Sequence, residues 1–111
     1  MKISEKLYNA RIEYNKAQNK ALELDLQRKP TLSRLILEIQ NKEKITQTKA
    51  EHMARVSEKY IIFLKEMLNA KIKASNQYAE LERLQYEFKE NESESYQKYQ
   101  ENKLTGGGFG D

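Results

Sequence analysis

Residues 53–88, MARVSEKYIIFLKEMLNAKIKASNQYAELERLQYEF, decide the fold of this 111-residue chain. Apolar side chains recur here at alternating spacings of three and four, which places them on one narrow stripe of an α-helix. An isolated helix would leave this stripe in water, so the pattern predicts partner helices. We call the stripe the seam and predict that it is an interaction surface; its larger members are Met53, Val56, Tyr60, Phe63, Met67, Leu81, Leu84 and Phe88. A second row lies beside its first half and comprises Ile61, Leu64, Leu68 and Ile72.

The composition favours an all-α protein with a thin core. Hydrophobic residues make up 38% of the chain and charged residues 33%, with four glycines and one proline. Helices that each bury one stripe can be built from this composition, whereas a thick globular core or a sheet cannot. There is no cysteine, no apolar run that would span a bilayer and no apolar core of a signal peptide. We therefore expect one cytoplasmic domain, with export by a partner apparatus as the open alternative.

A first helix is predicted over residues 3–27. Its apolar positions repeat at four and three residues and are Ile3, Leu7, Ala10, Tyr14, Ala17, Ala21 and Leu24. Pro30 removes an amide donor and disfavours helical geometry at Lys29, so we predict that this helix ends just before the proline. The short link favours an antiparallel helical hairpin, or antiparallel coiled coil, between one short N-terminal helix and one long helix.

The long segment after Pro30 has two interpretations. Neither proline nor glycine occurs again before Gly106, so residues 31–103 are predicted as one continuous helix. Such a helix would leave the seam open for a second copy or another helical protein. Alternatively the chain turns within residues 41–48, forms a three-helix bundle and closes the seam itself. In both cases residues 1–103 form a single helical domain with a break near Pro30. Residues 104–111 form a flexible Gly-rich tail, in which Phe109 is a candidate anchor for a partner.

The sequence offers no arrangement of residues that indicates catalysis. His52 is the one histidine, and the residues three and four positions away from it are not carboxylates. No Glu-x-x-His pair and no glycine-rich loop before a helix is present, so neither a metal site nor a phosphate site is indicated. We predict a protein that is not an enzyme, with no catalytic or metal-binding residues, no cofactor and no small-molecule substrate.

Charge is distributed unevenly along the chain. Residues 26–50 carry six basic and two acidic side chains, whereas residues 79–101 carry seven glutamates and three basic side chains. Ends of opposite charge favour antiparallel or staggered pairing between copies. The basic stretch is also a candidate surface for nucleic acid and comprises Arg28, Lys29, Arg34, Lys42, Lys44 and Lys49.

Three functions are compatible with these features. The leading hypothesis is a coiled-coil adaptor, assembly or scaffold protein that acts through the seam, by self-association or by binding another helical protein. The second is a nucleic-acid-binding accessory protein, of the kind found in recombination or replication, that uses the basic stretch. The third is a small export chaperone or co-secreted partner of a bacterial secretion system. In general form the chain resembles helical-hairpin proteins of bacterial secretion systems and phages, although it has no tryptophan and so lacks the Trp-x-Gly turn of the secreted hairpin family.

Overall fold

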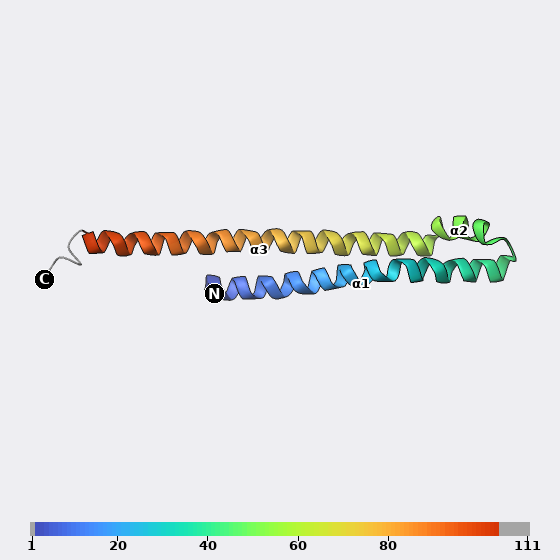
Figure 1. Ribbon diagram of the computed structural model, residues 1–111, viewed down its shortest axis with the longest axis horizontal. Helices are drawn as coiled ribbons and strands as arrows, with labels where there is room; N and C mark the ends of the chain where they lie inside the picture. Colours follow the sequence, from blue (N-terminus) through green and yellow to red (C-terminus); the bar gives the residue numbers. More distant parts are fainter. Residues whose placement is uncertain (1, 105–111) are drawn as a thin grey trace.

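The computed structural model describes residues 2–104, which form three helices. α1 (Ile3–Glu43) and α3 (Glu58–Leu104) lie side by side and antiparallel, and the short α2 (Gln47–Arg55) packs on the last part of α1 (Figure 1). No strand occurs among the described residues. The predicted all-α helical hairpin is therefore confirmed, but its turn lies elsewhere in the sequence.

α1 continues through Pro30, so the predicted break at this residue is wrong. A proline inside a helix leaves the carbonyl four residues earlier, here that of Leu26, without its amide donor. Residues 25–30 are all exposed, so water can hydrogen-bond to this carbonyl. Leu24 and Leu35 are buried on either side of the exposed stretch and hold the helix in place. The proline is tolerated because it lies on the side of α1 that faces solvent.

The hairpin turns at residues 44–46, so the prediction of one helix over residues 31–103 is also wrong. Lys44 adopts the left-handed conformation (φ 52°, ψ 45°), and its N–H donates to the carbonyl of Gln40 at 2.9 Å. Thr46 then begins α2, since its Oγ1 accepts a hydrogen bond from the N–H of Lys49 at 3.3 Å. The turn falls within the range 41–48 of the alternative interpretation.

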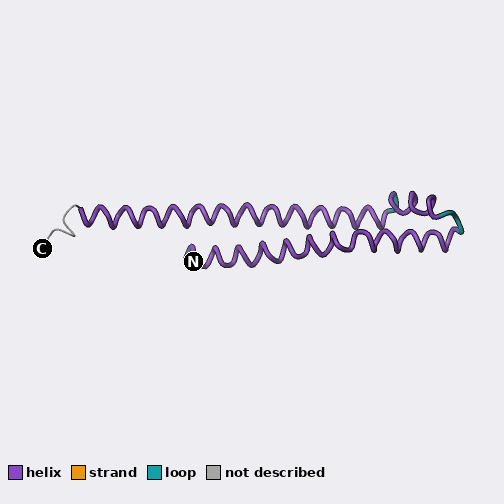
Figure 2. The backbone as a smooth tube through the Cα atoms, viewed as in Figure 1, coloured by secondary structure: helices purple, strands orange, loops and turns teal. Residues whose placement is uncertain are grey.

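A second link, at Val56 and Ser57, separates α2 from α3 (Figure 2). The Ser57 hydroxyl donates to the carbonyl of Ala54 at 2.7 Å and accepts from the N–H of Tyr60 at 3.3 Å. One side chain thus satisfies a carbonyl at the end of α2 and an amide at the start of α3. This link divides the seam: Met53 lies before it in α2, Val56 lies within it, and the other six members belong to α3.

The core lies along the contact between α1 and α3 in two clusters. Near the start of α1, Ala10 is buried with Leu81 and Leu84; near the turn, Leu35 is buried with Ala54 of α2 and Tyr60. Small residues at Ala17 and Ala21 are buried between the clusters. The predicted stripe of the first helix therefore faces α3.

α3 is longer than the part of α1 that covers it. Its 47 residues extend over about 70 Å at 1.5 Å per residue, and its C-terminal part projects beyond the start of α1 (Figure 1). Every residue from 89 to 99 is exposed. We call residues 89–104 the C-terminal extension.

Candidate interaction surface

The seam is covered mainly by α1 of the same chain. Tyr60, Leu81 and Leu84 are buried. Phe63, Met67 and Phe88 are partly buried, whereas Met53 and Val56 are exposed beside the second link. A partner of the hairpin therefore meets its flanks, because α1 already occupies the line of the seam within α3.

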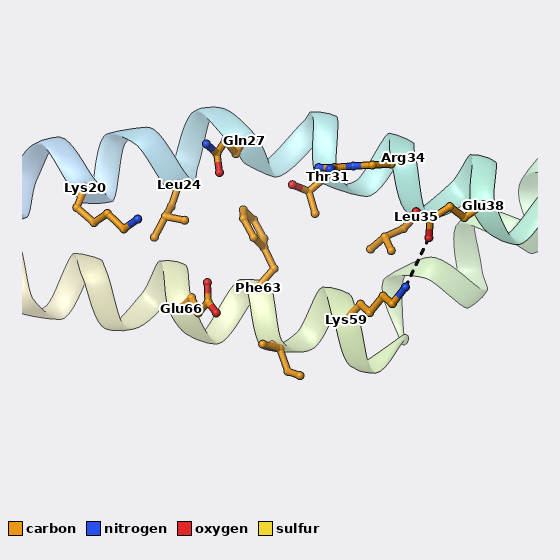
Figure 3. A pocket seen from close by; sticks show the side chains of 11 residues that line it. Lys20, Leu24, Gln27, Thr31, Arg34, Leu35, Glu38, Lys59, Phe63 and Glu66 are labelled. Carbon is orange, nitrogen blue, oxygen red and sulfur yellow. Dashed lines mark ion pairs between the residues drawn. The ribbon is translucent and has the colours of Figure 1, made fainter.

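Phe63, in the widest part of the apolar pattern, is only partly buried. Its ring points from α3 towards Gln27 and Thr31 of α1 (Figure 3) and stacks on Tyr60, with ring centres 6.4 Å apart. It borders a cavity of about 500 Å³ between the two helices. The cavity stays open because polar side chains, Gln27 and Thr31, occupy the α1 positions opposite the ring.

The rim of this cavity is charged and belongs to one side of the hairpin. Lys59 Nζ lies 3.7 Å from Glu38 Oε2 across it (Figure 3). Two further cavities lie between α1 and α3, and at least half of the residues that line each of them are charged. We call this side the polar flank; its residues include Lys6, Glu13, Lys20 and Arg34 of α1 and Lys59, Glu66, Lys73 and Glu80 of α3.

Arg83 organises the charges at one end of the polar flank. Its guanidinium donates to Glu80 at 2.7 Å and to Glu87 at 3.4 Å. The hydrogen bond from Arg83 lowers the pKa of Glu80 below its ordinary value. Both partners are exposed to solvent, so these contacts fix side-chain positions along the helix rather than contribute much to stability.

The opposite side of the hairpin carries the second apolar row. Lys71 precedes Lys73 by two residues, and side chains two residues apart point to nearly opposite sides of a helix. The Nζ of Lys71 reaches across to Asp25 Oδ1 of α1 at 3.4 Å. Leu68 lies three residues before Lys71 and Leu64 lies seven residues, or about two helical turns, before it, so both share its side of α3.

This side exposes a continuous set of large apolar groups. Ile61, Leu68 and Ile72 of α3 are exposed, and Leu64 between them is partly buried. On α1, Leu22 is exposed one turn before Asp25. We call the side the apolar flank and define it by Leu22, Ile61, Leu64, Leu68 and Ile72. Contiguous apolar groups on a surface are typical of an interaction site.

The six predicted basic residues do not form one surface. Arg34 lines the cavity of the polar flank. Arg28 and Lys29 line a small cavity that also contains Leu32, Arg55 and Tyr60, and Leu32 and Arg34 lie on nearly opposite sides of α1. Lys42, Lys44 and Lys49 lie at and around the turn. All six are exposed, but the structure distributes them around the hairpin.

The sequence did not predict two features of the structure. The first is Ser57, which lies between α2 and α3 but inside an unbroken apolar pattern. The residue three positions later is neither glutamate nor glutamine, so the sequence has no capping box that would mark the start of a helix. Tyr96 and Tyr99 are exposed in the C-terminal extension, beyond the reach of α1. Phe109, the candidate tail anchor, and the rest of residues 105–111 lie outside the described residues.

The described part of the chain shows no further kind of site. Within residues 2–104, no group of three or more His, Cys, Asp or Glu side chains is placed to hold a metal ion. None of the three helices has a stretch both long enough and apolar enough to cross a membrane. His52 is exposed on α2. Comparison of the chain with protein-family models, with curated proteins and with solved structures found no match.

Proposed function

We propose that this protein is a non-enzymatic helical interaction protein, of the adaptor or assembly type, and that it self-associates through the apolar flank. The observation that carries this proposal is the exposure of Ile61, Leu68 and Ile72 in a hairpin whose seam is already covered. The apolar residues of α3 thus exceed what α1 can bury. Ile61, Leu68 and Ile72 lie on one side of the hairpin, where a second molecule has access to them.

The spacing of the exposed row suits a helical partner. Positions 61, 64, 68 and 72 follow at three and four residues and form a straight edge of about 17 Å at 1.5 Å per residue. The apolar face of another helix fits such an edge by placing its own residues between them. Removal of these apolar side chains from water would favour such a complex.

Nucleic-acid binding is not favoured by the arrangement of the basic residues. A phosphate backbone is tracked by a continuous basic groove or stripe. Here Arg34 lies beside Glu38 and Glu66 on the polar flank, whereas Arg28 and Lys29 lie around the other side of α1. An export chaperone would use the same apolar flank as an adaptor and would differ only in its client.

Two matched variants test the proposal. Leu68 is 55% exposed on the apolar flank, and Ile62 is 49% exposed on the same helix but on the polar flank. We expect Leu68→Ser to weaken self-association by about tenfold or more, as loss of a central apolar contact does, while Ile62→Ser leaves it unchanged. Sedimentation equilibrium of the full chain over a range of concentrations measures both. A wild-type protein that stays monomeric throughout, or equal effects of the two variants, contradicts the proposal.

A further inference from the structure

We propose that the partner of the apolar flank is the C-terminal extension of α3 from a second copy of this chain. The two copies pair antiparallel, so that each extension covers the apolar flank of the other. This inference rests on the proposed function, because it names the partner of the same surface.

Among residues 2–104, no other helix runs beside the C-terminal extension (Figure 1). It projects beyond the start of α1 (Figure 1), and its two tyrosines, Tyr96 and Tyr99, are 65% and 61% exposed. Most of the stability of a helix in a protein comes from packing of one of its faces. Since Tyr96 and Tyr99 are three residues apart, they share one side of the helix and supply such a face.

The chemistry of the extension complements that of the apolar flank. Residues 89–104 contain four glutamates and three lysines, and three of the glutamates fall within residues 90–97, where there is no basic residue. The apolar row has Lys65 and Lys71 within it, and Arg28 and Lys29 lie beside it on α1. These four basic side chains outnumber the acidic ones there, Asp25 and Glu58. An acidic helix is therefore attracted to this flank, while a basic one is repelled.

Tyrosine is well suited to a surface that is both apolar and basic. Its ring buries apolar area and also accepts a cation on its face, while its hydroxyl stays hydrated at the edge. In the extension, Lys103 Nζ already lies 6.0 Å from the centre of the Tyr99 ring. Lys65 of a second copy offers the same kind of contact from the other side of the interface.

The lengths of the two segments agree with reciprocal pairing. The apolar row covers residues 61–72, about 17 Å, and the extension covers residues 89–104, about 23 Å, at 1.5 Å per residue. When two copies pair antiparallel about a two-fold axis near residue 82 of α3, the centre of the apolar row in one copy lies opposite the centre of the C-terminal extension in the other. Both contacts then form at once, as an isologous dimer requires. Parallel pairing would instead bring the basic turn regions of the two copies together.

Crosslinking between introduced cysteines tests this arrangement, because the natural chain contains none. Full-length protein with Leu68→Cys is mixed with full-length protein with Ser95→Cys, and a short bifunctional thiol reagent is added. Cysteine keeps an apolar group at position 68, and position 95 adjoins Tyr96 without removing either tyrosine. We expect the mixed 68–95 product to form at least about tenfold faster than the product of Ile62→Cys with Ser95→Cys, since position 62 lies on the polar flank.

The remaining outcomes separate this inference from the proposed function. If the chain self-associates but position 68 crosslinks mainly to position 68, the apolar flanks meet each other and the inference is wrong while the proposed function stands. A wild-type protein that is monomeric throughout overturns both. As a second measurement, the double substitution Tyr96→Ser with Tyr99→Ser should raise the dimer dissociation constant about tenfold or more and leave the hairpin folded by circular dichroism. Unchanged association of this folded variant would overturn the inference.

Discussion

At the scale of single residues, burial is governed by what stands opposite each side chain. Phe63 occupies the widest part of the apolar pattern but faces Gln27 and Thr31, so its ring borders a cavity. Leu84 lies nearer the end of the seam but packs with Ala10 and Leu81, and it is among the most buried large side chains. The width of an apolar pattern therefore does not by itself identify the best-packed position.

This difference predicts the effect of shortening two leucines. Leu84→Ala should lower the free energy of unfolding by about 2–5 kcal/mol, because it removes buried methyl groups and leaves a cavity. Leu37→Ala is the control, because Leu37 is 59% exposed whereas Leu84 is 4% exposed. Substitutions on the surface usually change the free energy of unfolding by no more than about 0.5 kcal/mol. Urea denaturation of both variants at the same low protein concentration makes the comparison. Equal losses would mean that the cluster around Leu84 does not form in solution.

At the scale of elements, the turn depends on a residue that sequence patterns do not associate with turns. Lys44 is the one residue other than glycine with positive φ among the described residues. The left-handed conformation costs a residue with a side chain roughly 1–2 kcal/mol, and glycine avoids this cost. The position at which α1 ends thus carries a strain that a single substitution can remove.

We accordingly expect Lys44→Gly to stabilise the protein. The gain should be about 0.5–1 kcal/mol, since the relief of the left-handed conformation is partly offset by the greater freedom of glycine in the unfolded chain. Lys42→Gly is the matched control, because Lys42 lies inside α1 and should lose about 1 kcal/mol. Thermal unfolding followed by circular dichroism shows both shifts. A fall in melting temperature for both variants would place the turn elsewhere.

The sequence predicted the class of fold and the buried faces but not where the helices end. The stripe from Ala10 to Leu24 and the stripe from Tyr60 to Leu84 were both evident from their spacing, and they do face each other. The helix break predicted at Pro30 was wrong because the effect of a proline depends on whether its side of the helix faces solvent. The end of α1 at Lys44 could not be predicted because residues 44–46 include neither glycine nor asparagine. The spacing also could not show that α1 covers much of the seam while Ile61, Leu68 and Ile72 stay exposed, because this depends on the position of the turn.

At the scale of the whole molecule, the position of the turn determines how much chain each contact between α1 and α3 encloses. The ion pair of Lys59 with Glu38 lies near the turn and encloses a short loop. The pair of Lys71 with Asp25 joins residues 46 apart in the sequence. The ring contact of Tyr14 with Tyr78, 5.4 Å between centres, encloses a longer loop still. Contacts therefore become steadily less local with distance from the turn.

This gradient has a kinetic consequence. The entropy lost on closing a loop increases with its length, so contacts near the turn form at a smaller cost than those near the start of α1. We expect α1 and α3 to associate first beside residues 44–57 and then progressively towards Ile3, and to separate in the reverse order. Native-state amide hydrogen exchange measures this: protection in α1 should rise from Leu7 towards Leu35. Uniform protection along α1 would mean that the two helices open as one cooperative unit, with no preferred end.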